Sequence, residues 1–346
     1  MTTTRDDLLA MAATLRKALD TPAAFPQWRA QWPALAELGI AGFCVPEDCE
    51  GFGAEVPAAL MAARELGAAL HGSPYPALVA ASYALTRWRG DGQRQPVAAE
   101  ISSGTHVPTL AFLGPGAVVA PPDGGVIPLV HGRAHLVAGA VSADSFLALP
   151  PGGDPILLIL RDETCTVARV HEFDVTRDIG DVDFGGATAV PLKAPPGGRA
   201  RVERLHGLLL AGDTLGGLSR MLDRTVGYAA QREAFGKAIG GYQAVQHRLV
   251  DHTIALRGMS LLADEAATQL AAEAPGADRA ALLAAASVTA GALPLLHDLV
   301  QLTGAIGFTW EYGLHLHERR AHLDARLGRG PRQARRLLAE GEGWTC

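Results

Sequence analysis

The spacing of hydrophobic residues changes twice along the chain, and this constrains the fold more than any other feature. Up to about residue 85, apolar side chains recur every three or four positions, as in amphipathic helices. Between about residues 105 and 192, glycine and proline recur every few positions and separate short apolar runs, a texture typical of short strands. Beyond a Pro/Gly-rich connector at residues 195–198 the helical period returns. This order excludes a doubly wound sheet, in which strands and helices alternate.

We therefore predict an α+β fold that is mostly α-helical. The expected parts are an N-terminal helical domain over residues 1–104, a β domain over 105–195 and a C-terminal four-helix bundle over 196–346. A long helix is expected from about Arg279 to Leu302, and Gly291 and Pro294 inside it should kink it.

Composition limits the partners. With 346 residues, of which 48% are hydrophobic, the chain can bury a sizeable core, and a net charge of −6 offers no basic field for nucleic acid or an anionic membrane. The four cysteines lack Cys-x-x-Cys spacing, and no basic and apolar leader is visible, so we expect a reduced, cytoplasmic protein. The alanine-rich runs are far shorter than the roughly 20 apolar residues that span a bilayer, so no membrane insertion is expected.

The most specific motifs lie in the C-terminal third. Arg232 offers the bidentate fork that a pyrophosphate needs, while Gln243 and Gln301 offer hydrogen bonds. Glycines at 304 and 307 remove side chains where a cofactor can approach. The two segments read YAAQREAFGKAIGGYQAVQH at 228–247 and QLTGAIGFTWE at 301–311, and near the N-terminus LGIAG, VPE and RELG occur at 38–42, 45–47 and 64–67.

These segments resemble the signatures of the acyl-CoA dehydrogenase family, R-x-x-F-G-x-x-I followed by Q-x-x-x-H, and Q-x-x-G-G-x-G-F-T-x-E. The resemblance implies a FAD-dependent α,β-desaturation of an acyl-CoA thioester, with an electron-transfer flavoprotein as partner. It also implies that one set of residues contacts the FAD of a neighbouring chain: Arg232, Phe235, Gln243, Gln301 and Gly304.

The same resemblance indicates where a general base should lie. A glutamate suits this task because burial against the flavin lifts its pKa toward neutral. Most members place it 27 residues after the glutamine of the glycine motif, where this chain has Gly328. Others place it 26 residues before the motif arginine, where this chain has His206. The usual base is therefore missing from the sequence.

The family's two loops around a chain's own flavin are also replaced. The neighbourhood of T-E-P-x-x-G-S-D reads TLAFLGPG at 109–116, and VAGAV at 137–141 stands in place of the Trp-x-Thr loop. Groups that the family donates to a neighbour are thus present, and groups that hold a chain's own flavin and substrate are not. We expect this chain to be one half of a heteromeric enzyme with a related acyl-CoA dehydrogenase subunit, in a heterotetramer or homotetramer.

Two alternatives stay open. The chain could be a self-sufficient homomeric desaturase with His206 as a non-standard base, since imidazole titrates in the useful range, or with Asp213 two helical turns further on. It could also be a non-catalytic structural subunit. Glu311 is expected to be structural, and His315 and His317 lack metal-ligand spacing. A basic tail contains seven arginines, at 319, 320, 326, 329, 332, 335 and 336. It is either a solvated helix with intersubunit ion pairs or a surface that steers CoA phosphates.

Overall fold

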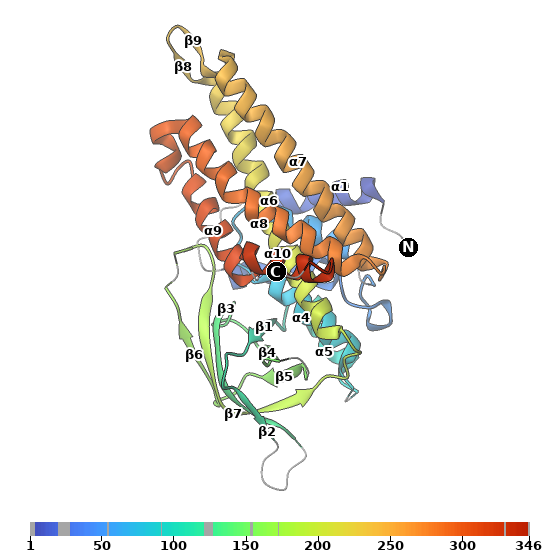
Figure 1. Cartoon of the computed structure of the whole chain (residues 1–346). Coiled ribbons are helices and arrows are strands. Elements are labelled where there is room, and N and C mark those ends of the chain that lie inside the picture. Colours follow the sequence, from blue (N-terminus) through green and yellow to red (C-terminus); the bar gives the residue numbers. More distant parts are fainter. Residues whose placement is uncertain are drawn as a thin grey trace. The chain divides into compact units, whose positions relative to one another are not determined.

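The computed structural model describes residues 4–19, 28–53, 55–90, 92–120, 127–152, 155–171, 173–328 and 330–344 (Figure 1). They divide into two compact units, and each is described by itself. Unit 1 comprises Met1–Ala59 and His71–His206, and unit 2 comprises Leu60–Leu70 and Gly207–Cys346.

Unit 1 begins with helices. Thr4 and Asp7 cap the first helix with a capping box, in which each side chain accepts from the backbone of the other residue. Nearly every side chain of α4 is buried, so this helix forms the centre of the helical part. The helices of this part of the chain are α1 (Arg5–Ala18), α2 (Trp28–Ala36), η1 (Ile40–Gly42), η2 (Glu47–Cys49), α3 (Val56–Ala68), α4 (Tyr75–Trp88) and α5 (Arg94–Ser102), and α3 belongs to unit 2 from Leu60 on.

A sheet of seven strands follows in the same unit. Its order is β1-β4-β5-β7-β3-β2, with β6 also paired to β7, and all pairs are antiparallel except β1 with β4. Phe146 and Phe184 meet edge to face in its core, with ring centroids 5.6 Å apart. The strands are β1 (Pro108–Phe112), β2 (Val118–Ala120), β3 (Leu129–Ala138), β4 (Ser145–Leu149), β5 (Leu157–Leu160), β6 (Cys165–Arg169) and β7 (Ile179–Pro191).

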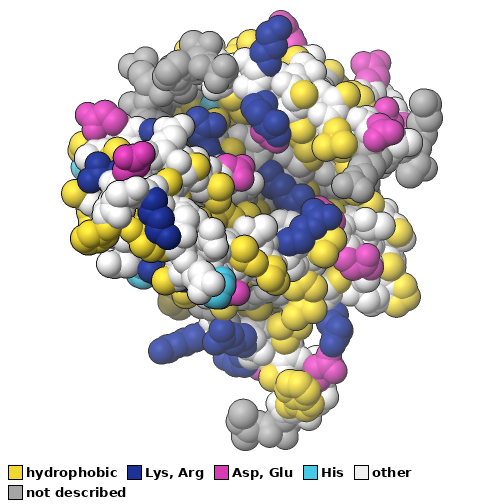
Figure 2. Space-filling model, turned by 90° about the horizontal axis from the view of Figure 1, so that it is seen from above, with side chains coloured by type: hydrophobic (Ala, Val, Ile, Leu, Met, Phe, Trp, Pro, Cys, Tyr) yellow, Lys and Arg dark blue, Asp and Glu magenta, His cyan; other side chains and the backbone are white. Residues whose placement is uncertain are grey.

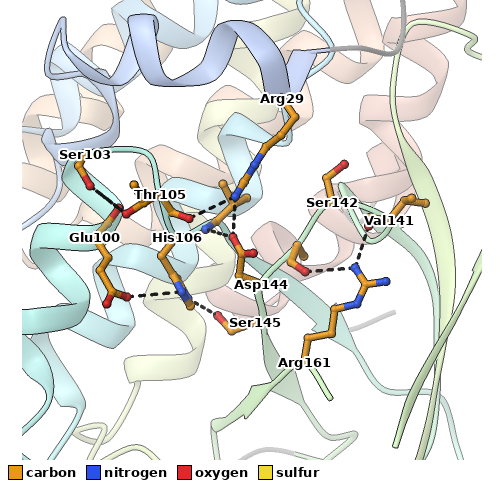
Figure 3. A network of polar contacts seen from close by, with 12 residues as sticks. Arg29, Glu100, Ser103, Thr105, His106, Val141, Ser142, Asp144, Ser145 and Arg161 are labelled. Atoms are coloured by element: carbon orange, nitrogen blue, oxygen red, sulfur yellow. Dashed lines mark hydrogen bonds and ion pairs between the residues drawn. The ribbon is translucent and has the colours of Figure 1, made fainter. Parts of the chain in front are cut away.

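A polar network joins helix α2 to this sheet (Figure 3). Arg29 donates to the Thr105 carbonyl at 3.2 Å and to Asp144 Oδ2 at 2.8 Å. The same carboxylate oxygen accepts from the backbone N of Val107 at 2.7 Å, just before β1. Asp144 precedes β4, so one carboxylate holds the entrances of two neighbouring strands and a helix together.

Unit 2 is a helical bundle. Glycines let the end of α3 cross α6 closely: a Cβ on Gly216 would lie 1.8 Å from the Arg64 carbonyl oxygen, and one on Gly67 would lie 2.0 Å from that of Asp213. The elements are α6 (Gly198–Gln231), β8 (Glu233–Ala234), β9 (Lys237–Ala238), η3 (Ile239–Gly241), α7 (Gln243–Ala271), α8 (Ala277–Thr303), η4 (Gly304–Phe308), α9 (Leu314–Leu327) and α10 (Gly330–Gly341).

Helix α8 bears on the expectation of no membrane insertion. Together with η4 it forms a stretch of 32 residues, Ala277–Phe308, which is long and apolar enough to cross a membrane by length and composition. The expectation rests on the alanine-rich runs within this region, which are short and broken by polar residues. Core helices of soluble bundles meet the same criteria, so the finding is weak evidence for a membrane span.

The α+β, mostly α-helical class is confirmed, with helices, then strands, then a helical bundle. The long helix expected from Arg279 to Leu302 is α8. The three domain boundaries stay predictions, and His206 at the end of unit 1 belongs to a helix that continues into unit 2.

Candidate functional site

The predicted arginine lies at the start of a hairpin that ends α6. The backbone N of Arg232 donates to the Tyr228 carbonyl at 2.8 Å, and its own carbonyl accepts from Ile239 N at 2.8 Å. The Arg232 side chain is exposed. These two bonds fix the backbone of Arg232 at the end of the bundle and leave its guanidinium free to meet an anion.

Phe235 occupies the tip of this hairpin. Phe235 and Gly236 both have positive φ angles, 52° and 83°, which is the geometry of a tight two-residue hairpin turn. The Phe235 side chain is 98% exposed. The hydroxyl of Tyr242 donates to the Ala234 carbonyl at 3.0 Å and so fastens the hairpin to the start of α7.

The second predicted segment is the turn after α8. Gly304 has φ 63° and ψ −139°, a conformation that only glycine adopts without strain. A Cβ on Gly304 would meet no atom within 4 Å, whereas one on the buried Gly307 would lie 2.3 Å from Thr303 Oγ1. Gly304 is thus required by the backbone and Gly307 by packing.

An ion-pair cluster brings the two glutamines to the same end of the bundle. Arg248 Nε on α7 donates to Asp298 Oδ2 on α8 at 2.9 Å, and His252 Nε2 lies 2.6 Å from the same oxygen. Hydrogen bonding from Arg248 is the largest cause that lowers the pKa of Asp298. Gln243 begins α7 five residues before Arg248, and Gln301 lies three residues after Asp298; both are exposed.

The C-terminal part of α6 and the segment after the glycine turn also meet through aromatic rings. Tyr228 of α6 and Tyr312, which follows the turn, pack edge to face with ring centroids 6.3 Å apart. The five predicted residues are therefore gathered at one end of unit 2, although no direct contact joins them in the described chain. Figure 2 looks down on the hairpin end and shows hydrophobic side chains exposed among charged ones. Large exposed side chains in this part of the sequence include Phe235, Phe308 and Trp310 at 98%, 70% and 62%.

This donor set fits one side of FAD. Arg232 supplies a cation for the pyrophosphate, Gln243 and Gln301 supply amides, and the open space at Gly304 admits close approach to the backbone. All these groups are exposed on the surface of the bundle end, so the remaining contacts to the cofactor must come from elsewhere.

The two positions where the family carries its base hold no carboxylate. His206 is buried and stacked on Phe112 of β1, with ring centroids 6.1 Å apart. Burial, and secondarily the charge of Arg177, lowers the pKa of His206 to about 3. Such a ring is neutral at pH 7 and holds an abstracted proton weakly. Gly328 ends α9, and the neighbouring Arg329 lies outside the described residues.

The segments in place of the family's flavin loops are tied to each other in unit 1. Thr109 Oγ1 on β1 donates to the Ala138 carbonyl at the end of β3, at 2.6 Å. Both residues are buried. The Thr109 hydroxyl is therefore used inside unit 1 to join β1 to β3.

The other candidates have structural contacts. Asp213 is buried and pairs with Arg320 of α9, Nη1 to Oδ1, at 3.2 Å. The backbone carbonyl of Glu311 accepts from Arg224 at 2.9 Å. His315 lies against Trp310, with ring centroids 4.7 Å apart. Among the described residues no group of three or more His, Cys, Asp or Glu could hold a metal ion.

Sequence reasoning missed the groups that position the site. Arg224, Arg248 and Asp298 lie on helices among many other charged residues, and no local motif marks them. Two long helices joined by a short loop run antiparallel, so the start of α7 must lie beside the end of α8. This is a weak signal that Arg248 and Asp298 lie close together.

Comparisons with known proteins agree with this geometry. Residues 3–105 match the acyl-CoA dehydrogenase N-terminal domain, and residues 202–340 match the acyl-CoA dehydrogenase C-terminal domain. The acyl-CoA dehydrogenase IpdE2 of Mycobacterium tuberculosis is 31% identical over 317 residues, covering 90% of this chain and 86% of that protein. The acyl-CoA dehydrogenase FadE34 of the same organism is 31% identical over 323 residues, covering 90% of this chain and 42% of that protein.

Among solved structures, a chain of the ChsE4-ChsE5 complex from Mycobacterium tuberculosis has a similar fold. The TM-score is 0.88 at 23% identity, and the match covers 100% of this chain and 100% of that chain. The two domain matches and the identity to IpdE2 over nearly the full length establish that the chain belongs to the acyl-CoA dehydrogenase family, whose members are FAD-dependent oxidoreductases that act on CH–CH groups.

Proposed function

We propose that this chain is one subunit of a heteromeric acyl-CoA dehydrogenase and completes the FAD site of a related, catalytically complete subunit. The assembly carries out α,β-desaturation of an acyl-CoA thioester and passes electrons to an electron-transfer flavoprotein. The observation that carries the proposal is the gathering of Arg232, Phe235, Gln243, Gln301 and Gly304 at one exposed end of unit 2.

The exposure of these groups supports donation to a neighbour. A residue that contacts the cofactor of a neighbouring chain must be accessible at the surface of its own chain, and these residues are. Phe235 instead projects from a hairpin with almost its whole surface in solvent, and burial of a phenylalanine side chain stabilises a complex by roughly 1.5 to 3 kcal/mol.

The surroundings of His206 support the absence of proton chemistry in this chain. A base for α-proton abstraction needs a pKa near the working pH. His206, with its pKa lowered to about 3, lies far below that range, and Gly328 has no side chain. In the proposed assembly the partner supplies the carboxylate that removes the proton.

The chain's own residues then have binding roles. Arg232 would supply a cation to the pyrophosphate of the partner's FAD, and the amides of Gln243 and Gln301 would orient the cofactor. The bound FAD would supply the acceptor for the hydride that leaves the β-carbon. The ChsE4-ChsE5 complex, named for two different chains, is a precedent in the same fold for a complex of two such chains.

The test is co-expression with a homologous subunit that retains the family's glutamate, followed by measurement of flavin per chain. We expect flavin in the complex, little in the lone chain, and at least a tenfold weaker affinity for FAD in the Arg232→Ala complex, because a charge-assisted contact to the pyrophosphate contributes about 1.5 to 3 kcal/mol. Arg220→Ala, another exposed arginine on α6, is the matched control and should leave the affinity unchanged.

The alternatives give different results. A lone chain that binds stoichiometric flavin and turns over an acyl-CoA would establish a self-sufficient desaturase. Unchanged FAD affinity in the Arg232→Ala complex would contradict the proposal that Arg232 contacts the partner's FAD. Absence of flavin from both preparations would identify a structural subunit.

A further inference from the structure

An exposed tryptophan follows the glycine turn, and none of the flavin contacts proposed above uses it. Trp310 is 62% exposed, although tryptophan is on average a highly buried residue. It fills the unspecified position of the signature F-T-x-E, so the resemblance to the family assigns it no role. A large aromatic ring left open to solvent beside the other candidate contacts is available for a ligand.

The ring of Trp310 is supported by one helix. The imidazole of His315 meets it edge to face, with ring centroids 4.7 Å apart. The guanidinium carbon of Arg319 lies 6.0 Å from the ring centroid, within the range of a cation–π contact. His315 and Arg319 are four residues apart on α9, so they lie on one face of that helix. The exposed ring therefore already has its orientation within this chain.

The backbone on both sides of Trp310 is also held in place. The backbone N of Gly313 donates to the Thr309 carbonyl at 3.1 Å and closes a turn that contains Trp310. Arg224 donates to the carbonyls of the two residues that follow Trp310, each at 2.9 Å. An aromatic side chain that is ordered before binding loses little conformational entropy when a ligand stacks on it.

Trp310 lies close to the arginine proposed for the pyrophosphate. The rings of Tyr228 and Tyr312 meet with centroids 6.3 Å apart. Arg232 follows Tyr228 by four residues, which is about 6 Å of helix, and Trp310 precedes Tyr312 by two residues. In FAD a single ribose joins the adenine ring to the pyrophosphate. A surface for the adenine must therefore lie near the cation that binds the pyrophosphate, as Trp310 does.

We infer that Trp310 is the stacking surface for the adenine ring of the FAD whose pyrophosphate Arg232 contacts. This inference rests on the proposed function and adds a ligand group and a residue to it. The occupant is a purine because a flat base stacks on an exposed indole through its π-face. Arg319 adds positive charge beside a ligand that carries two phosphates.

Titration of the flavin-free heteromeric complex with FAD and with FMN tests the inference. FMN has the isoalloxazine and one phosphate but no adenosine. Trp310→Ala should weaken FAD binding by roughly 5- to 150-fold, the range that base stacking on an aromatic side chain provides, and should leave FMN binding unchanged. Trp310→Phe keeps an aromatic face and should retain most of the FAD affinity. Flavin fluorescence measures each affinity.

Trp344→Ala is the matched control. Trp344 is 70% exposed and follows Glu342, which pairs with Arg279 at the start of α8. Trp310 instead follows the other end of this helix of 27 residues, which is about 40 Å long. Loss of the Trp344 indole should therefore leave the affinities for FAD and FMN unchanged.

Sedimentation velocity of the Trp310→Ala complex separates a ligand contact from a protein contact. Dissociation of this complex, or equal losses of FAD and FMN affinity, would show that Trp310 packs on the partner protein and would overturn the inference. Weaker acyl-CoA binding at unchanged FAD affinity would assign the adenine to CoA and would overturn it too.

The Arg232→Ala complex separates this inference from the proposed function. If Arg232→Ala weakens FAD binding and Trp310→Ala does not, the stacking role is wrong and the proposed function stands. If neither variant weakens FAD binding, the proposed function is wrong as well.

Discussion

The guanidinium of Arg224 on α6 lies over the ring of Tyr312, with Cζ 4.5 Å from the ring centroid. Its two terminal nitrogens donate to successive backbone carbonyls, those of Tyr312 and Glu311, each at 2.9 Å. These carbonyls follow the glycine turn, and Arg224 lies on α6, eight residues before Arg232, which directly follows the end of that helix. One side chain therefore holds together the two segments that carry the proposed FAD contacts.

Replacing Arg224 should weaken FAD binding in the heteromeric complex. We expect Arg224→Ala to lower the affinity by about tenfold, because two hydrogen bonds of roughly 0.5 to 1.5 kcal/mol each position the glycine turn. Arg224→Lys should not restore the affinity, since an ammonium lacks the planar fork that bonds two carbonyls while stacking on a ring. Fluorescence titration of the flavin-free complex with FAD measures both.

Arg64→Ala is the control for loss of an arginine that binds a carbonyl. Arg64 donates to the Ser260 carbonyl at 3.1 Å elsewhere in unit 2, and its loss should leave the FAD affinity unchanged. If Arg232→Ala loses FAD but Arg224→Ala does not, Arg224 has no positioning role and the proposed donation still stands.

The buried pair of Asp213 and Arg320 should be important for the stability of unit 2. Both side chains are almost fully buried, at 3% and 2% exposed. Removal of one partner of a buried ion pair is strongly destabilising, so Asp213→Ala should lower the free energy of unfolding by about 3 to 5 kcal/mol. Urea denaturation measures this loss. Asp264→Ala breaks an exposed pair with Arg64 and should cost less than about 1 kcal/mol. If both variants lose the same free energy of unfolding, burial of the ion pair does not determine the size of the loss.

The fold class was predictable from the sequence, and local motifs marked candidate site residues, but the contacts that position these residues were not predictable. Helical spacing and the Gly/Pro-rich middle led to the correct order of helices and strands. Arg232 and Gly304 were marked by local motifs, because their roles depend on a guanidinium and on a backbone angle that few other residues can replace.

The positioning contacts were not predictable because they join residues far apart in sequence. Arg224 and Tyr312 are 88 positions apart, and Arg248 and Asp298 are 50 apart. Asp213 was considered as a substitute base, since a carboxylate two turns beyond His206 is visible in the sequence. Its pairing with Arg320 depends on the packing of α9 against α6, which no local pattern specifies.

His206 should make the folded chain sensitive to acid. Its pKa is lowered to about 3 in the folded protein, mainly by burial, whereas an unfolded histidine titrates near 6.5. Between these values the unfolded chain binds one more proton, so the stability that neutral His206 contributes is present above pH 6.5 and is lost as pH falls. The slope from this group approaches about 1.4 kcal/mol per pH unit within that window.

His206→Gln should reduce the loss of stability between pH 7 and pH 4.5, as measured by urea denaturation at each pH. His171→Gln, which removes an exposed imidazole from the same unit, is the control. An unchanged pH slope in His206→Gln would show that the ring is charged or hydrated in the folded protein.

We expect Phe235 to lower the stability of the lone chain and to strengthen FAD binding in the heteromeric complex. A bulky residue at φ 52° in a two-residue turn is unfavourable, and Asn before Gly is the preferred sequence there. Phe235→Asn should therefore raise the melting temperature of the isolated chain or leave it unchanged, and it should reduce aggregation by removing a phenylalanine that is 98% exposed. In the heteromeric complex the same change should weaken FAD binding, because the apolar contact at the hairpin tip is lost. A higher melting temperature of the lone chain together with a weaker FAD affinity of the complex would show that the strained tip serves binding. A lower melting temperature together with a weaker FAD affinity would show that Phe235 stabilises the hairpin itself.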